Sequence, residues 1–170
     1  MPDSKTRLQC PIYGLLDNVR SAWNVGSMFR TADSAGLGGL YLCGMTPTPP
    51  RADLEKTALG ASATMPWDYW TDSAAAVRHI KDRGIQVVAL ECTPDAQPFD
   101  SFDYRFPLCF VVGHEVRGVG EPVLDACDAT LAIPMNGLKD SLNVAVSFGI
   151  MAYQVRRSWL DQADPSSRQA

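Results

Sequence analysis

Apolar residues along the chain fall into two patterns, short continuous runs and runs with a helical period. Six short runs bounded by turn residues predict strands, at 11–16, 40–43, 65–70, 85–91, 108–112 and 129–133. The run at 108–112 is apolar without alternation, as expected for a central parallel strand that is covered on both faces. These runs therefore predict a mostly parallel sheet.

Helical patterns separate the predicted strands. In the first of them, Asn24 is the expected N-cap, and apolar residues recur on one face at Val25, Met28, Phe29, Ala32 and Ala35. Further helices are expected at 71–83 and 121–127, and a short helix or turn at 54–61. The alternation of strands and helices predicts an α/β fold, with one domain over residues 1–160 and a disordered tail at 161–170.

The last predicted helix, 141–159, is apolar on nearly all sides. One stripe contains Val144, Phe148, Met151 and Val155, and a second contains Leu142, Val146, Gly149, Ile150 and Tyr153. A helix with two apolar faces is buried on both sides. We expect one face to cover the sheet and the other to contact a second subunit.

Composition narrows the function classes. The chain has 170 residues, 46% of them hydrophobic and 20% charged, and it contains no apolar run of membrane-spanning length or signal-peptide character. We therefore expect a cytoplasmic protein without membrane contact. The net charge of −4 argues against a protein that coats polyanions, but RNA binding by one basic face remains open.

The five cysteines are widely spaced, without a C-x-x-C pair, and only His79 and His114 could join them as metal ligands. This spacing favours buried free thiols over a metal site or disulfides, so no metal is expected.

Three polar clusters each follow a predicted strand, at 24–30, 113–118 and 133–148. In the third, Ser141 and Asn143 are expected where the last helix begins, and free backbone N–H groups there favour electron-rich ligands. Each cluster alone is weak: an Asn-x-Gly-x-x-x-Arg segment is commonly a capped helix with a surface arginine. The glycine loop has neither G-x-G-x-x-G spacing nor the Lys-Ser/Thr of a P-loop.

Together and in this order, the clusters resemble the SpoU (TrmH) branch of the SPOUT RNA methyltransferases. The form N-x-G-x-x-x-R-T-A of its first motif is matched at 24–32, and the G-x-E-x-x-G form of its second at 113–118. The form I-P-M-x-G-x-x-x-S-L-N-V of its third motif is matched at 133–144. His114 and Ala145 depart from the family pattern, in which Asn or Pro and Ser are more usual.

The resemblance implies a SPOUT-type fold with a C-terminal deep trefoil knot, which general topology rules would not suggest. It also implies a homodimer with the active site at the interface and S-adenosylmethionine as cofactor. The residues that it assigns to cofactor binding are Leu90, Gly113, Ile133 and Leu142.

The implied reaction is methylation of a ribose 2′-hydroxyl in tRNA or rRNA, with tRNA favoured. Arg30 is the main catalytic candidate; because arginine is a poor base, it is expected to bind phosphate and stabilise the developing alkoxide. Asn24 holds Arg30 or the ribose, or only caps its helix. Glu115 positions Arg30 or a substrate group, or only binds backbone N–H groups.

Ser141 and Asn143 contact substrate and cofactor, cap the last helix, or do both. The candidates for contacts with RNA phosphates are Arg20, Arg117 and Lys139. Two other functions are alternatives: an RNA-binding module of the same fold without catalysis, and a Rossmann-like nucleotide-binding enzyme. Retention of the five catalytic candidates argues against the first, and the absence of a G-x-G-x-x-G after any predicted strand argues against the second.

Overall fold

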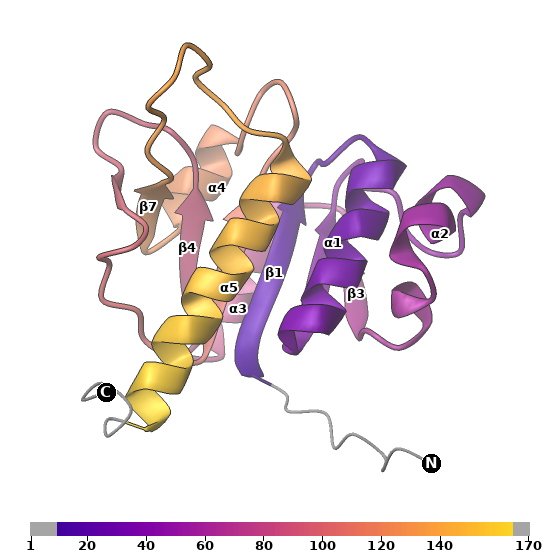
Figure 1. The fold of residues 1–170 in the computed structure, drawn as a ribbon, viewed down its shortest axis with the longest axis horizontal. Coiled ribbons are helices and arrows are strands. Elements are labelled where there is room, and N and C mark those ends of the chain that lie inside the picture. The colour runs from indigo at the N-terminus through magenta and orange to yellow at the C-terminus, as the bar shows by residue number, and fades with distance from the viewer. Residues whose placement is uncertain (1–9, 165–170) are drawn as a thin grey trace.

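The computed structural model describes residues 10–164, which form a seven-stranded sheet with helices on both faces (Figure 1). The strands are β1 (Cys10–Asp17), β2 (Leu37–Cys43), β3 (Trp67–Trp70), β4 (Gln86–Leu90), β5 (Gln97–Pro98), β6 (Leu108–Val112) and β7 (Ala129–Ala132). Their order is β3-β2-β1-β6-β4-β7-β5, and all neighbours are parallel. The predicted α/β fold with a mostly parallel sheet is confirmed.

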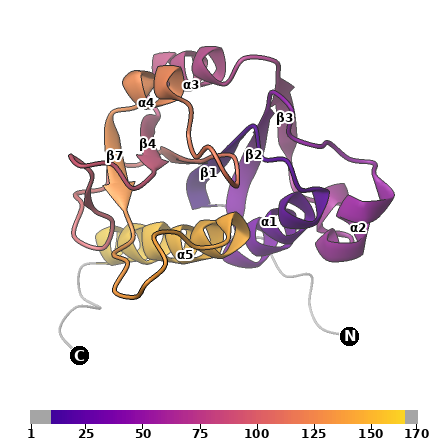
Figure 2. The same cartoon turned by 90° about the horizontal axis from the view of Figure 1, so that it is seen from above.

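The helices form two layers, one on each face of the sheet (Figure 2). α1 (Ala22–Ala35), α2 (Ala52–Ala58) and α5 (Val144–Ala163) lie on one side. A short 3₁₀ turn at Ala61–Ala63 follows α2 in the sequence. α3 (Ser73–Asp82) and α4 (Glu121–Ala126) lie on the other side.

Alternate residues of the central strands fill two apolar cores. On β1, Ile12 and Leu16 belong to the core that includes Phe148 of α5, whereas Leu15 belongs to the core that includes Val77 of α3. The continuous apolar run predicted for the central strand reflects this burial on both faces, since every residue of β6 is buried.

Two helix starts differ from the prediction. Ser21, not Asn24, is the N-cap of α1, and its hydroxyl accepts the N–H of Asn24 at 3.3 Å. α5 begins at Val144 instead of residue 141, because the Asn143 side chain caps it by accepting the N–H groups of Ala145 and Val146. The first difference leaves the whole Asn24 side chain available for contacts outside its helix end, whereas Asn143 uses its oxygen as the cap and has only its amide N–H groups available.

The end of α5 also differs from the prediction. The helix continues to Ala163, and Arg157 pairs with Asp161 at 2.9 Å one turn later, so residues 161–163 are helical. Asp164 is the C-cap of α5, and the rest of the predicted tail, residues 165–170, lies outside the described part of the chain, as do residues 1–9. None of the helices within residues 10–164 has the length and apolarity needed to cross a membrane.

The cysteines are free thiols in different surroundings. Cys10, Cys43 and Cys109 are buried, and burial raises the pKa of Cys43 to about 12, so that thiol is unreactive at neutral pH. Cys92 is exposed, so the prediction of a buried thiol is wrong there. It lies two residues after the end of β4 at Leu90, outside the buried strand.

Candidate active site

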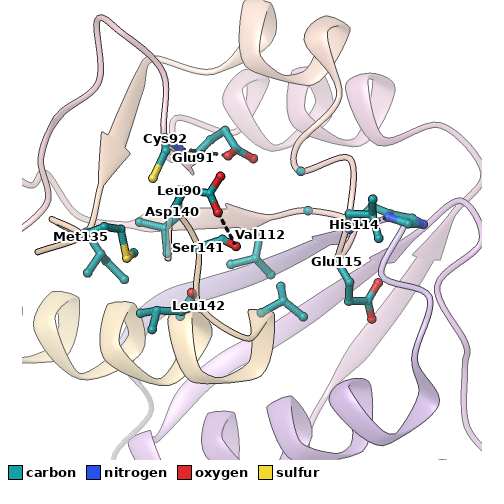
Figure 3. A pocket seen from close by; sticks show the side chains of 16 residues that line it. Leu90, Glu91, Cys92, Val112, His114, Glu115, Met135, Asp140, Ser141 and Leu142 are labelled. Carbon is teal, nitrogen blue, oxygen red and sulfur yellow. Dashed lines mark hydrogen bonds between the residues drawn. The ribbon is translucent and has the colours of Figure 1, made fainter. Parts of the chain in front are cut away.

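The loops that follow β4, β6 and β7 meet at the carboxyl edge of the sheet and enclose a cavity of about 450 Å³ (Figure 3). Parallel strands bring their carboxyl ends to one edge, which is where open α/β folds bind ligands. All four predicted cofactor residues line this cavity: Leu90, Gly113, Ile133 and Leu142. Glu115 and Ser141 line it as well, whereas Arg30 does not.

Buried and half-buried carboxylates hold the glycine-rich loop 113–120 in place. Glu91 accepts the N–H of Val119 at 2.8 Å and the N–H of Cys92 at 3.0 Å, so it joins the loops after β4 and β6. Asp17, which is 2% exposed, accepts the N–H of Gly120 at 2.8 Å. Backbone N–H groups that would otherwise lack partners are thereby satisfied, and the wall is preorganised.

Gly113 is needed at the start of this loop because its backbone packs directly against the returning chain. A Cβ atom at this position would overlap the backbone of Gly118 and Val119. The two segments are also joined by paired hydrogen bonds between His114 and Gly118, at 3.0 and 2.8 Å. Any larger residue would therefore push this wall of the cavity apart.

His114 has a structural function in the same loop. Its Nδ1 accepts the N–H groups of Val116 at 3.0 Å and of Arg117 at 3.3 Å. This acceptor closes the turn, so the departure from the more usual Asn or Pro leaves the loop intact.

One hydrogen-bond network joins the three sequence motifs. The Glu115 carboxylate accepts the N–H of Ser21 at 2.8 Å, the N–H of Arg20 at 2.9 Å and the Asn24 amide at 3.0 Å. The Asn143 amide donates to Asn24 Oδ1 at 3.3 Å. Asn24, Glu115 and Asn143 thus meet, although they are far apart in sequence.

Burial alone would raise the pKa of Glu115, but the hydrogen bonds from Arg20, Ser21 and Asn24 outweigh it. The net result is a pKa below the ordinary value of 4.5, so Glu115 is ionised at neutral pH. A charged acceptor holds the start of α1 more firmly than a neutral one would.

Arg30 lies on α1 about 9 Å along the helix axis from Asn24, given the rise per residue of an α-helix. It is exposed and lines a second pocket, together with Ser27, Thr31, Ser34, Lys56, Thr57, Leu59 and Tyr153. This pocket shares no lining residue with the cavity above. We call it the Arg30 groove; within one chain the structure does not bring Arg30 to the cavity.

The remaining predicted residues lie near the same edge of the sheet. Ser141 is exposed and donates to Asp140 at 3.4 Å, outside the last helix. Arg20, Arg117 and Lys139 are exposed, and the Arg117 guanidinium lies 3.8 Å from the Met45 sulfur. Their positions leave all three side chains accessible to a ligand at the mouth of the cavity.

Sequence reasoning missed Asp17 and Glu91. Both are carboxylates placed directly at the carboxyl end of a buried strand, where the backbone of the neighbouring loop has free N–H groups. A charged residue at that place, in an otherwise apolar run, was the available signal.

The cavity fits S-adenosylmethionine in size and in lining. Its volume falls within the range of ordinary cofactor pockets. Leu90, Val112 and Leu142 offer apolar surface to an adenine ring, while Glu91, Glu115 and Asp140 place carboxylates around a cationic ligand (Figure 3). Across residues 10–164, no three His, Cys, Asp or Glu side chains gather in a way that could hold a metal ion.

Comparisons with known proteins agree with this arrangement. The profile of the SpoU rRNA methylase family matches residues 11–153. A 23S rRNA (guanosine-2′-O-)-methyltransferase of Shewanella oneidensis, RlmB, is 31% identical over 147 residues, which are 86% of this chain and 59% of that protein.

Two solved structures are similar in fold and sequence. The AdoMet-bound rRNA methyltransferase from Sinorhizobium meliloti is 31% identical, with a TM-score of 0.81 over 86% of this chain and 56% of that one. A structure described as giving insights into the 2-OH methylation of C/U34 on tRNA is 27% identical, with a TM-score of 0.78 over 88% of this chain and 97% of that one. The chain thus spans less than two thirds of the first two proteins and nearly all of the third.

Proposed function

Because the chain belongs to the SpoU rRNA methylase family, we propose that it transfers a methyl group from S-adenosylmethionine to a ribose 2′-hydroxyl of tRNA or rRNA. The observation that carries the proposal is the cavity at the carboxyl edge of the sheet, which ends at the Asn24–Glu115–Asn143 network. That arrangement offers a cofactor pocket beside polar groups that could orient a substrate hydroxyl.

S-adenosylmethionine supplies a methyl group that its positive sulfonium already activates. In our proposal Leu90, Gly113, Ile133 and Leu142 hold it through apolar contact and the backbone of the three loops. The bound cofactor is also recorded in the Sinorhizobium meliloti structure, which supports the same cofactor here.

The difficult part of the reaction is the nucleophile, since a ribose hydroxyl must lose its proton as it attacks. Asn24 and Asn143 can orient the ribose, because Glu115 fixes the Asn24 amide. Arg30 would bind the neighbouring phosphate and stabilise the developing alkoxide, since a guanidinium stays protonated at neutral pH. Ser141 would contact the substrate at the rim, and Arg20, Arg117 and Lys139 would contact phosphates.

We further propose that the active form is a homodimer joined through α5. Val146, Ile150 and Tyr153 are 51%, 37% and 49% exposed and form one apolar stripe on this helix, opposite the buried Phe148, Met151 and Val155. A second copy on this stripe would be next to the Arg30 groove, because Tyr153 lines that groove. The Arg30 of one chain would then complete the cavity of the other.

Two finer points belong to the same proposal. The C-terminal segment would form the trefoil knot. This is supported by the loop after β7 and the start of α5, which line one cavity together with the loops after β4 and β6. A cytoplasmic location would follow from an RNA substrate.

For the substrate we favour tRNA. RlmB is named for 23S rRNA, but this chain spans only 59% of it. The structure connected with C/U34 of tRNA is matched over 97% of its length, which supports a tRNA substrate.

The test is to incubate the chain with methyl-labelled S-adenosylmethionine and separated tRNA and rRNA, then digest the RNA to nucleosides. The expected product is a labelled 2′-O-methylnucleoside from tRNA. Label in a base would contradict ribose methylation. Binding of RNA and cofactor without any transfer would favour the inactive RNA-binding module instead.

A further inference from the structure

Trp23 has an exposed indole side chain, and the proposed reaction gives it no function. It precedes Asn24 in the first turn of α1, and its side chain is 52% exposed. Tryptophan is enriched among the residues that dominate binding energy at interfaces, although a single exposed indole is by itself ordinary. Trp23 belongs to none of the motif positions that carry the family resemblance.

The position of Trp23 is tightly fixed. Its carbonyl oxygen accepts the hydroxyls of Ser27 at 3.0 Å and Thr57 at 2.9 Å, which ties α1 to α2. Gly26 permits this close approach, since a Cβ atom there would overlap the Thr57 hydroxyl and the Leu54 carbonyl. The indole is therefore presented on a rigid base.

A cation lies over the ring. Lys56 Nζ of α2 is 5.7 Å from the centroid of the Trp23 ring, a cation–π distance. Trp23, Ser27, Arg30 and Ser34 recur on one face of α1, so the indole borders the Arg30 groove. Among the described residues that line this groove, Arg30 and Lys56 are charged and none is a carboxylate, although the whole chain has a net charge of −4.

An exposed aromatic ring with a lysine over it, and an arginine two turns further along the same helix face, has the composition that single-stranded nucleic acid requires. Bases stack on aromatic faces, and the neighbouring phosphates pair with lysine and arginine. In Figure 1, α1 lies between α5 and α2. Lys56, which lies over the Trp23 ring, belongs to α2, so a second copy on α5 would approach α1 from the opposite side. We propose that Trp23 is a stacking platform for a base of the substrate RNA, next to the target nucleotide, with Lys56 and Arg30 on its phosphates.

This inference rests on the proposed function, because it takes RNA as the substrate. Trp23 would be a positioning residue for RNA and would not touch the cofactor. Its loss should raise the KM for RNA while leaving kcat and cofactor affinity unchanged, a split that a merely structural role would not produce.

The experiment measures the affinity of the whole chain for a fluorescently labelled tRNA pool, together with the KM and kcat for methyl transfer. We expect Trp23→Ala to weaken tRNA binding about tenfold, the usual size of one base–aromatic stack. Trp23→Phe should keep most of the affinity because it keeps an aromatic face. Trp67→Ala removes an exposed indole from the edge strand β3 and is the matched control, with no expected change.

Intrinsic fluorescence gives a second readout, since stacking on a base should quench Trp23. The wild-type quench on adding tRNA should shrink in Trp23→Phe and persist in Trp67→Ala. Sedimentation of Trp23→Ala should match that of the wild type.

Three outcomes would overturn the inference. If Trp23→Ala binds and methylates tRNA like an active wild type, the platform is wrong while the proposed function stands. If the wild type neither binds nor methylates any RNA, the proposed function fails and the inference fails with it. If Trp23→Ala changes the oligomeric state, the indole is covered by a second copy instead of RNA.

Discussion

The cavity that the loops after β4, β6 and β7 enclose differs from the Arg30 groove in how its walls are held in place. In the cavity, carboxylates of Asp17, Glu91 and Glu115 satisfy the backbone N–H groups of the surrounding loops. The groove consists of side chains on helix surfaces, and Arg30 itself is exposed. One region is preorganised by its own chain, whereas the other is open on the side of Tyr153 and α5.

This difference separates two tasks of a methyl transfer reaction. Holding a cofactor requires fixed walls, which a single chain provides here. Acting on a large RNA requires an open, cationic surface, because the substrate brings the remaining wall. We infer that the two regions become one site only when a second chain and RNA are present.

Arg30→Ala should have the largest effect, because it removes the guanidinium that would stabilise the developing alkoxide and leaves the cavity unchanged. We expect methyl transfer to fall at least about a hundredfold, as for loss of an electrostatic donor in other active sites. Titration calorimetry should give wild-type affinity for S-adenosylmethionine. The rate of methyl transfer by Arg30→Lys should stay well below that of the wild type, because lysine lacks the planar guanidinium that donates two parallel hydrogen bonds. Wild-type turnover of Arg30→Ala would refute the catalytic assignment.

Ile150→Glu tests whether the exposed apolar stripe of α5 joins two chains into a dimer. A carboxylate buried without a partner opposes association, so sedimentation should show monomers and activity should fall about tenfold or more. Cofactor affinity should stay unchanged, because Ile150 lies outside the cavity.

The matched control is Arg78→Glu, which also adds negative charge to an exposed helix position, but on α3 across the sheet. It should keep both the dimer and the activity. A monomeric wild type with full activity would contradict the proposed interface.

Gly113→Ala should damage the cavity and spare the groove. Its Cβ would overlap the Gly118 and Val119 backbone, so the loop must shift, at a cost of about 1–3 kcal/mol in unfolding free energy. Because the same loop lines the cavity, affinity for S-adenosylmethionine should fall about tenfold. Gly137→Ala is the control, since its added Cβ meets nothing within 4 Å. Equal cofactor affinity in both variants would show that the loop does not bind the cofactor.

Glu115→Gln should give the smallest effect, and it should depend on pH. The folded-state pKa of Glu115 is lowered from 4.5, so its ionised form stabilises the fold above that pH. This contribution is lost as pH falls through the lowered pKa. Near pH 7 we expect urea titrations to give the variant a free energy of unfolding about 1–3 kcal/mol lower than that of the wild type.

Below pH 4.5 the difference between Glu115→Gln and wild type should shrink, because the wild-type carboxyl becomes protonated. A difference that grows on acidification would mean that Glu115 is not held as an anion. A difference independent of pH would mean that its charge is irrelevant.

The strand ends at the cavity could be predicted from the sequence, because glycine and polar residues bound each buried apolar run. The position of the cavity follows from them, since it lies where three such strand ends meet. The cap of α1 was wrong, because both Ser21 and Asn24 are good capping residues and only the distant Glu115 decides between them. The functions of Asp17 and Glu91 were missed for the same reason, since their partners are in other loops.

The separation of Arg30 from the cavity was also not predictable. A motif places residues in order along the chain, but it does not say which face of a helix points to which pocket. Spacing along α1 puts Arg30 on the face of Ser27 and Ser34, and only the packing of α2 and α5 shows that this face borders a different pocket.

A subunit-mixing experiment tests most directly whether the cavity and the groove of two chains form one site. Arg30→Ala and Gly113→Ala chains would be purified separately, refolded together, and measured for methyl transfer to tRNA. The S-adenosylmethionine concentration would be kept well below the dissociation constant of Gly113→Ala, so that this variant alone has little activity. If Arg30 completes the cavity of its partner, each mixed dimer has one intact site, and activity should return to about a quarter of wild type for random pairing in a two-fold dimer. If the mixture is no more active than the mean of the two variants refolded separately, Arg30 does not act in the cavity of its partner, and the proposed shared site is wrong.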